Sequence, residues 1–163
     1  MNDFADHLPT PERLRQRLRR LRRGPLLRDA LADVSLRPVN FVLPVFVADI
    51  DQPRPVASMP GVQQWPVFAA VEQIRQWYAQ GLSQFLLFGV TPESAKDATG
   101  SFAAHPDAPV NRTLARVRDA GLPVTLYADL CFCEYTDHGH CGPLCDDPHL
   151  IVDNDRTLEA LAR

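Results

Sequence analysis

Three cysteines lie within eleven positions of one another near the C-terminal end of the sequence. Cys131 and Cys133 are two residues apart, and Cys141 follows after a turn-prone segment. In an extended backbone the side chains of residues i and i+2 point the same way, so the first two sulfurs face one side. The turn can bring the third sulfur back towards them. Three converging thiolates can hold zinc and leave its fourth coordination position open, as catalytic zinc sites do.

The spacing alone leaves other interpretations of these cysteines open. Cysteines are often small buried hydrophobic residues, and a disulfide pair is a further alternative. Cys145 is either a fourth metal ligand or a loop thiol that takes no part in binding. The N-terminus has no apolar segment typical of a secretory signal, which indicates a cytoplasmic protein. In that compartment, cysteines more often bind metals or stay reduced than form a disulfide framework.

The cysteines directly follow an apolar, β-prone stretch that contains Asp129 near its end. Other segments show apolar residues either in strand-length runs or at helical spacing, and Val71, Ile74, Trp77 and Tyr78 are spaced as one inward helix face. The expected elements are a helix over 26–34, a strand over 41–48, a helix over 67–80, a strand over 85–90, a helix over 108–119, a strand over 124–130 and a helix from Arg156 capped by Asp155.

The alternation of strands and helices predicts right-handed βαβ units and a parallel sheet. Folds of this class keep their chemistry at the C-terminal ends of the strands. Asp129 and the three cysteines stand at such an end. Their position therefore favours the interpretation as a metal site.

The N-terminal segment is basic, whereas the rest of the chain is acidic. Residues 1–30 hold eight arginines against four acidic residues, and the whole chain has a net charge of −3. Leu14, Leu18 and Leu21 form a narrow helical stripe among the arginines. A basic amphipathic segment can bind nucleic acid or an anionic membrane, but no aromatic residues interleave here and no apolar run reaches membrane-spanning length. We therefore expect no nucleic acid or membrane partner, and expect the arm to pack on an acidic neighbouring subunit.

Several stretches resemble one known family. The segment from Asp129 to Gly142 resembles the zinc-binding segment of zinc-dependent 5-aminolevulinate dehydratases, also called porphobilinogen synthases. The resemblance covers roughly residues 19–163. Other family signatures are matched, in order, by Ser58–Val62, Leu87–Val90, Lys96–Asp97 with Gly100–Ser101, and Val152–Asp155 with Thr157–Leu158.

The resemblance implies an α/β fold that is part of a (β/α)8 TIM barrel, with about three βα units and an N-terminal arm. We expect the arm over residues 1–38 and the N-terminal part of the barrel, with the zinc loop, over residues 39–163. The family is a lyase that condenses two 5-aminolevulinate molecules into porphobilinogen in haem and other tetrapyrrole biosynthesis, usually as an octamer. A homo-oligomer, or a complex with a chain that completes the barrel, is therefore expected.

The resemblance also assigns roles to individual residues. Cys131, Cys133 and Cys141 would bind Zn2+, and Asp129 would be an active-site aspartate beside the metal. His140 would orient the cysteine loop without binding the metal. Glu134 stands where the family usually has a proline.

The catalytic lysines of the family have no match here. The family forms Schiff bases through two lysines on later barrel strands, whereas the one lysine in this sequence, Lys96, matches a loop lysine. Three strands cannot close a barrel, which needs about 250 residues. We therefore expect a truncated gene product, one piece of a split enzyme or a subunit completed by oligomerisation. Such a chain would be inactive alone and would act on 5-aminolevulinate only when complemented. The alternative is a degenerate half-barrel that serves as a non-enzymatic oligomerisation or regulatory partner.

Overall fold

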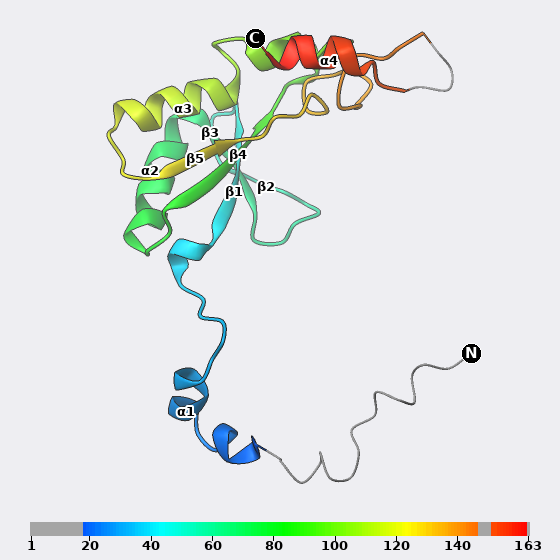
Figure 1. Ribbon diagram of the computed structural model, residues 1–163. Coiled ribbons are helices and arrows are strands. Elements are labelled where there is room, and N and C mark those ends of the chain that lie inside the picture. Colours follow the sequence, from blue (N-terminus) through cyan, green and yellow to red (C-terminus); the bar gives the residue numbers. More distant parts are fainter. Residues whose placement is uncertain (1–17, 147–150, 163) are drawn as a thin grey trace, which may run out of the picture. The chain divides into compact units, whose positions relative to one another are not determined.

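The computed structural model describes residues 18–146 and 151–162 (Figure 1). Contacts within the chain group it into two units that divide between Leu36 and Arg37. The first unit contains the 3-10 helix η2 (Leu18–Arg22) and the helix α1 (Pro25–Ala30). Leu14 of the leucine stripe lies outside the described residues.

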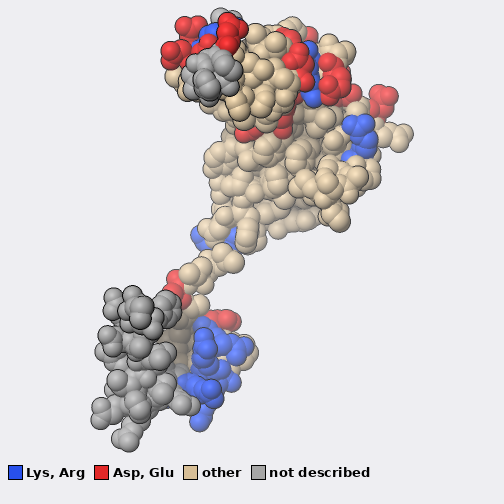
Figure 2. Space-filling view, turned by 90° about the vertical axis from the view of Figure 1, so that its right-hand side faces the viewer, with Lys and Arg blue, Asp and Glu red and all other residues tan. Residues whose placement is uncertain are grey.

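Helix α1 is shorter than the helix expected over residues 26–34. It begins at Pro25, a residue suited to the first helical position because proline has no N–H to leave unpaired. It ends after Ala30, where the N–H of Leu31 is shared between the carbonyls of Leu27 and Arg28. Leu26 is 85% exposed. Arginines gather on the surface of this first unit (Figure 2).

The second unit carries the sheet and the helices around it. Its elements are η3 (Pro38–Asn40), β1 (Val42–Ala48), β2 (Arg54–Pro55), β3 (Gln63–Pro66), α2 (Val67–Ala79), β4 (Gln84–Val90), η4 (Glu93–Ala95), η5 (Ser101–Ala104), α3 (Pro109–Asp119), β5 (Thr125–Ala128) and α4 (Asn154–Leu161). None of the helices in the described ranges is long and apolar enough to span a bilayer.

The strands form one mixed sheet in the order β2-β3-β1-β4-β5. The three expected strands, β1, β4 and β5, pair in parallel as predicted, and β3 adds to β1 in parallel. The short strand β2 is antiparallel to β3, so the sheet is mixed and not parallel throughout. Strand β3 was also not expected. Its short sequence, Gln-Gln-Trp-Pro, has no apolar run, and it is held as a strand because Gln64–Pro66 pair with the edge of β1 from Phe46 to Ala48.

Helices α2 and α3 cover one face of the sheet (Figure 1). Ile74 of α2 and Phe85 of β4 are fully buried there, and Trp77 stacks on Phe85 with ring centroids 6.1 Å apart. Tyr78, expected on the inward face, is 40% exposed because Trp77 takes the inward position in the last turn of α2. The buried cluster consists of Val45, Val47, Ala70, Ile74, Phe85, Leu87, Val110 and Val117.

The opposite face of the sheet is much less covered. Phe46 and Phe88, which alternate with the buried residues, stack on each other with ring centroids 5.3 Å apart and are only half-buried. Tyr127 on β5 is 42% exposed. The sheet therefore presents aromatic and aliphatic side chains on a face that no described helix covers.

The C-terminal elements differ from expectation in two details. Strand β5 ends at Ala128 rather than at Leu130, because the chain leaves the sheet after the backbone hydrogen bond of Asp129, and Leu130 is 72% exposed. Helix α4 is capped by Asp153 and not by Asp155. The Asp153 carboxylate accepts a hydrogen bond from the N–H of Arg156 at 3.1 Å, the bond by which an N-cap side chain satisfies the first helical turn.

Candidate metal centre

The three cysteines predicted as ligands converge in the structure. The Sγ atoms of Cys131, Cys133 and Cys141 all lie within 4.8 Å of one another, and those of Cys131 and Cys133 are 3.3 Å apart. In a tetrahedral site with Zn–S bonds of about 2.3 Å, the sulfurs lie about 3.8 Å apart. Cys131 and Cys133 are half-buried and Cys141 is exposed. The cluster fits a thiophilic cation of zinc's size that keeps one open side.

The end of β5 and a tight turn position the first two thiols. The N–H of Asp129 donates to the carbonyl of Leu87 at 3.2 Å and so extends the β5–β4 ladder by one residue. Beyond it, the N–H groups of Tyr135 and Thr136 both donate to the carbonyl of Phe132, at 2.8 and 2.9 Å. The backbone is thus turned rather than extended, but both sulfurs still face the same side.

The thiols of Cys133 and Cys141 hold their protons more strongly than usual when no cation lies between them. Burial, followed by the contact with Cys131, raises the pKa of Cys133 to about 12. The pKa of Cys141 is also raised, mainly by its interaction with Cys131. A cation has to displace these protons when it binds, because metals take cysteine as thiolate. Binding is therefore expected to strengthen as the pH rises.

Two carboxyl groups lie beside the thiols. Asp129, which the sequence indicated, is joined by Glu134, which was noted only as a departure from the family. Burial raises the pKa of Glu134 to about 7, and the charge of Asp129 adds to this, while a hydrogen bond from Gly89 and the charge of Lys96 oppose it. Glu134 can therefore hold or release a proton near neutral pH.

We expect Glu134→Gln to flatten the dependence of stability on pH. Because the folded pKa of about 7 exceeds the ordinary value of 4.5, Glu134 stabilises the fold below pH 4.5, and this contribution is lost as the pH rises through 7. The urea unfolding midpoint of the reduced chain should therefore fall less between pH 5 and pH 8 in this variant than in the wild type. Glu159→Gln, at an exposed position, is the control. Equal declines in wild type and Glu134→Gln would contradict the assignment.

His140 contributes to the loop through its backbone. Its carbonyl accepts a hydrogen bond from Thr136 Oγ1 at 2.8 Å, and its N–H donates to His138 Nδ1 at 3.1 Å. The two imidazole rings lie 5.5 Å apart. The role of His140 in orienting the cysteine loop stays a prediction.

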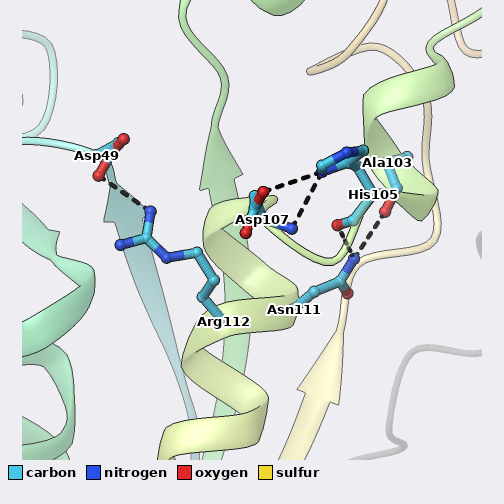
Figure 3. A network of polar contacts seen from close by, with 6 residues as sticks. All are labelled: Asp49, Ala103, His105, Asp107, Asn111 and Arg112. Atoms are coloured by element: carbon cyan, nitrogen blue, oxygen red, sulfur yellow. Dashed lines mark hydrogen bonds and ion pairs between the residues drawn. The ribbon is translucent and has the colours of Figure 1, made fainter.

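The loop between β4 and α3 borders the site and was not singled out from the sequence as part of it. Figure 3 shows how its C-terminal half is anchored: Asn111 Nδ2 donates to the carbonyls of Ala103 and His105, at 3.0 and 2.9 Å. Arg112 of the same helix pairs with Asp49, which follows β1, at 3.1 Å. The N-terminal half of the loop contacts the cysteine segment, with a backbone bridge between Asp97 and Thr136.

A family model described as delta-aminolevulinic acid dehydratase matches residues 15–163. The chain belongs to this family. The delta-aminolevulinic acid dehydratase of Mycobacterium leprae (strain TN) is 46% identical over 146 residues, which cover 88% of this chain and 44% of the relative. That of Escherichia coli (strain K12) is 40% identical over 150 residues, which cover 91% of this chain and 44% of the relative. The family membership inferred from the sequence is confirmed.

A solved structure of the family matches the fold. The crystal structure of the delta-aminolevulinic acid dehydratase of Toxoplasma gondii ME49, in complex with the reaction product porphobilinogen, superposes with a TM-score of 0.82 and 26% identity. The match covers 89% of this chain and 41% of that one. The chain thus spans less than half the length of the dehydratases it matches.

Proposed function

We propose that these residues form the N-terminal, zinc-binding part of a porphobilinogen synthase. The observation that carries the proposal is the convergence of the Cys131, Cys133 and Cys141 sulfurs within 4.8 Å, in a chain of this family. Thiolates favour zinc over hard cations such as Mg2+ and Ca2+. The substrate would be 5-aminolevulinate and the product porphobilinogen, the compound bound in the Toxoplasma gondii relative.

The proposed architecture is part of a (β/α)8 barrel preceded by an arginine-rich arm. Four neighbouring parallel strands and the superposition on a dehydratase structure support it. The uncovered face with Phe46, Phe88 and Tyr127 is what the inward face of an open barrel would present. Association with further barrel strands, in a homo-oligomer or with a completing chain, would bury that face.

The residues around the thiols have distinct roles in this proposal. Zinc, when bound, supplies a Lewis acid that polarises a substrate oxygen or a bound water. Asp129 and Glu134 place two carboxyl groups next to it, and Glu134 can carry a proton at neutral pH. Lys96 matches a loop lysine of the family, so we do not assign it the Schiff-base chemistry; its Nζ pairs with Glu93 Oε1 at 2.6 Å.

A complementation assay tests the proposal. The 163-residue chain would be incubated with 5-aminolevulinate and zinc, alone and with a second polypeptide comprising the part of the Mycobacterium leprae relative that lies beyond the match. We expect no porphobilinogen from the chain alone, because its one lysine, Lys96, matches a loop lysine of the family and not one of the two Schiff-base lysines. We expect product from the mixture, and its loss when Cys133→Ser replaces the wild-type chain.

Two outcomes would redirect the assignment. Product from the chain alone would overturn the role given to Lys96. Failure of every complementing chain to yield product, with a stable complex nonetheless formed, would favour the non-enzymatic role as an oligomerisation or regulatory partner. The uncovered sheet face is the observation that favours this second function.

A further inference from the structure

The segment from Asp97 to Ser101 contacts the cysteine loop at several points while contributing no ligand to the thiol cluster. We infer that this segment positions the three thiols, and that Asp97 is the positioning residue on which metal affinity depends. The inference rests on the proposed zinc site and adds to it a determinant that lies on a different βα loop.

The Asp97 carboxylate locks the segment into one conformation. Its Oδ1 accepts hydrogen bonds from the N–H of Thr99 at 2.7 Å, the hydroxyl of Thr99 at 2.8 Å and the N–H of Ser101 at 3.2 Å. Its Oδ2 accepts a further hydrogen bond from the hydroxyl of Ser101. These bonds favour the ionised carboxylate, and they lower the pKa of Asp97 well below its ordinary value. Four bonds to one side chain leave the turn little freedom.

The locked segment pairs with the cysteine loop through its backbone. The N–H of Asp97 donates to the carbonyl of Tyr135 at 3.3 Å, and the N–H of Asp137 donates to the carbonyl of Asp97 at 3.1 Å. His138 Nε2 lies 3.2 Å from the carbonyl oxygen of Ala98. These contacts fall between Cys133 and Cys141, so they fix the part of the loop that returns the third thiol to the first two.

The contact between the Phe132 side chain and Gly100 restrains the segment that carries the first two thiols. Phe132 lies between Cys131 and Cys133 and is 5% exposed. Its ring packs against Gly100, where an added Cβ would lie 2.8 Å from Phe132 Cδ1. Gly100 also has φ +66°, a conformation that favours glycine. Any side chain at position 100 would therefore collide with the Phe132 ring, and glycine lets the ring pack directly on the backbone of the Asp97 turn.

Thr136 links the Asp97 turn to Cys141, the third proposed ligand. It is 1% exposed, its backbone bridges to Asp97, and its hydroxyl donates to the carbonyl of His140, the residue before Cys141. A cluster of ligands held in place before the metal arrives avoids the cost of ordering the loop on binding. Partners that orient metal ligands without touching the metal typically contribute about 10- to 100-fold to affinity.

The test compares Asp97→Ala, Asp97→Asn and the control Asp107→Ala, an exposed aspartate at the end of the same β4–α3 loop. Zinc affinity would be measured by competition with a chelator, and site geometry by the absorption spectrum of the cobalt(II)-loaded chain. We expect Asp97→Ala to bind zinc roughly 10- to 100-fold more weakly and to lose the intense bands of tetrahedral thiolate coordination. Asp97→Asn should restore both to within a few-fold, because its Oδ1 can accept three of the four hydrogen bonds. Asp107→Ala should match the wild type.

Other outcomes overturn the inference in distinguishable ways. An Asp97→Ala chain with lowered thermal stability but wild-type affinity and spectrum would show that Asp97 acts on the fold alone. If Asp97→Ala does not fold, Ser101→Ala removes only one of the four bonds, and an unchanged zinc affinity in that variant would overturn the inference. Absence of zinc and cobalt binding by the wild-type chain would overturn the proposed zinc site together with this inference.

Discussion

Replacing Cys131, Cys133 and Cys141 together with serine is expected to abolish tight zinc binding by the chain. The three sulfurs are the metal-ligand cluster that the described residues contain, and serine presents a neutral hydroxyl where zinc prefers thiolate. Each single replacement should weaken binding by more than about 100-fold, since even partners outside the coordination sphere contribute about 10- to 100-fold. Chelator competition and the sulfur-to-cobalt charge-transfer band give the affinity and the number of thiolates.

Cys145→Ser is the matched control, because Cys145 belongs to the same loop region but not to the cluster. It should leave zinc affinity and the charge-transfer intensity unchanged. Loss of binding in Cys145→Ser would make Cys145 a fourth ligand, the alternative that the sequence left open. Retention of tight binding in the triple variant would contradict the site.

Phe85→Ala is expected to cost about 3–5 kcal/mol of unfolding free energy, the range for deleting a buried aromatic ring. Phe85 is fully buried near the start of β4, where it pairs with Leu43 and Leu126 and stacks on Trp77. Domains are typically stable by about 5–15 kcal/mol, so the variant should be marginally folded at best. Urea denaturation followed by circular dichroism would measure the loss.

Phe68→Ala provides the comparison, since Phe68 lies on α2 but is 59% exposed. Its replacement should change the unfolding free energy by less than about 1 kcal/mol, as expected for a surface position. Similar losses in the two variants would indicate that the core does not lie between β4 and α2. The pair therefore tests the packing of α2 on the sheet whose strand β5 leads to the thiols.

Much of the fold could be predicted because its signals are local. The apolar runs at residues 41–48 and 85–90 became β1 and β4, and the helical spacing over 67–80 and 108–119 became α2 and α3. Gly81 and Gly121, which follow the ends of those helices, have φ values of +98° and +61°, a conformation that favours glycine. Strand and helix periodicity and glycine conformation depend on residues within a few positions, so a single sequence contains them.

Elements that depend on distant partners could not be predicted in this way. Strand β3 exists because the edge of β1 pairs with it, and its own sequence has no strand signal. Tyr78 and Trp77 are both apolar enough for the inward face of α2, and only the position of Trp65 and Phe85 decided between them. The N-cap of α4 is Asp153 and not Asp155, because the helix begins at Asn154, two residues earlier than the sequence indicated.

The candidate site likewise has a part that local sequence signals indicate and a part that depends on distant segments. The sequence by itself determined the family and the three thiols, because the Cys-x-Cys spacing and the following turn lie within eleven positions. Only the tertiary structure decided what surrounds them: Glu134 beside Asp129, and Asp97 paired with Thr136 across thirty-nine positions of chain. Residue type and short-range spacing indicate candidate ligands, whereas a bridge between distant segments, as between Asp97 and Thr136, leaves no local pattern in the sequence.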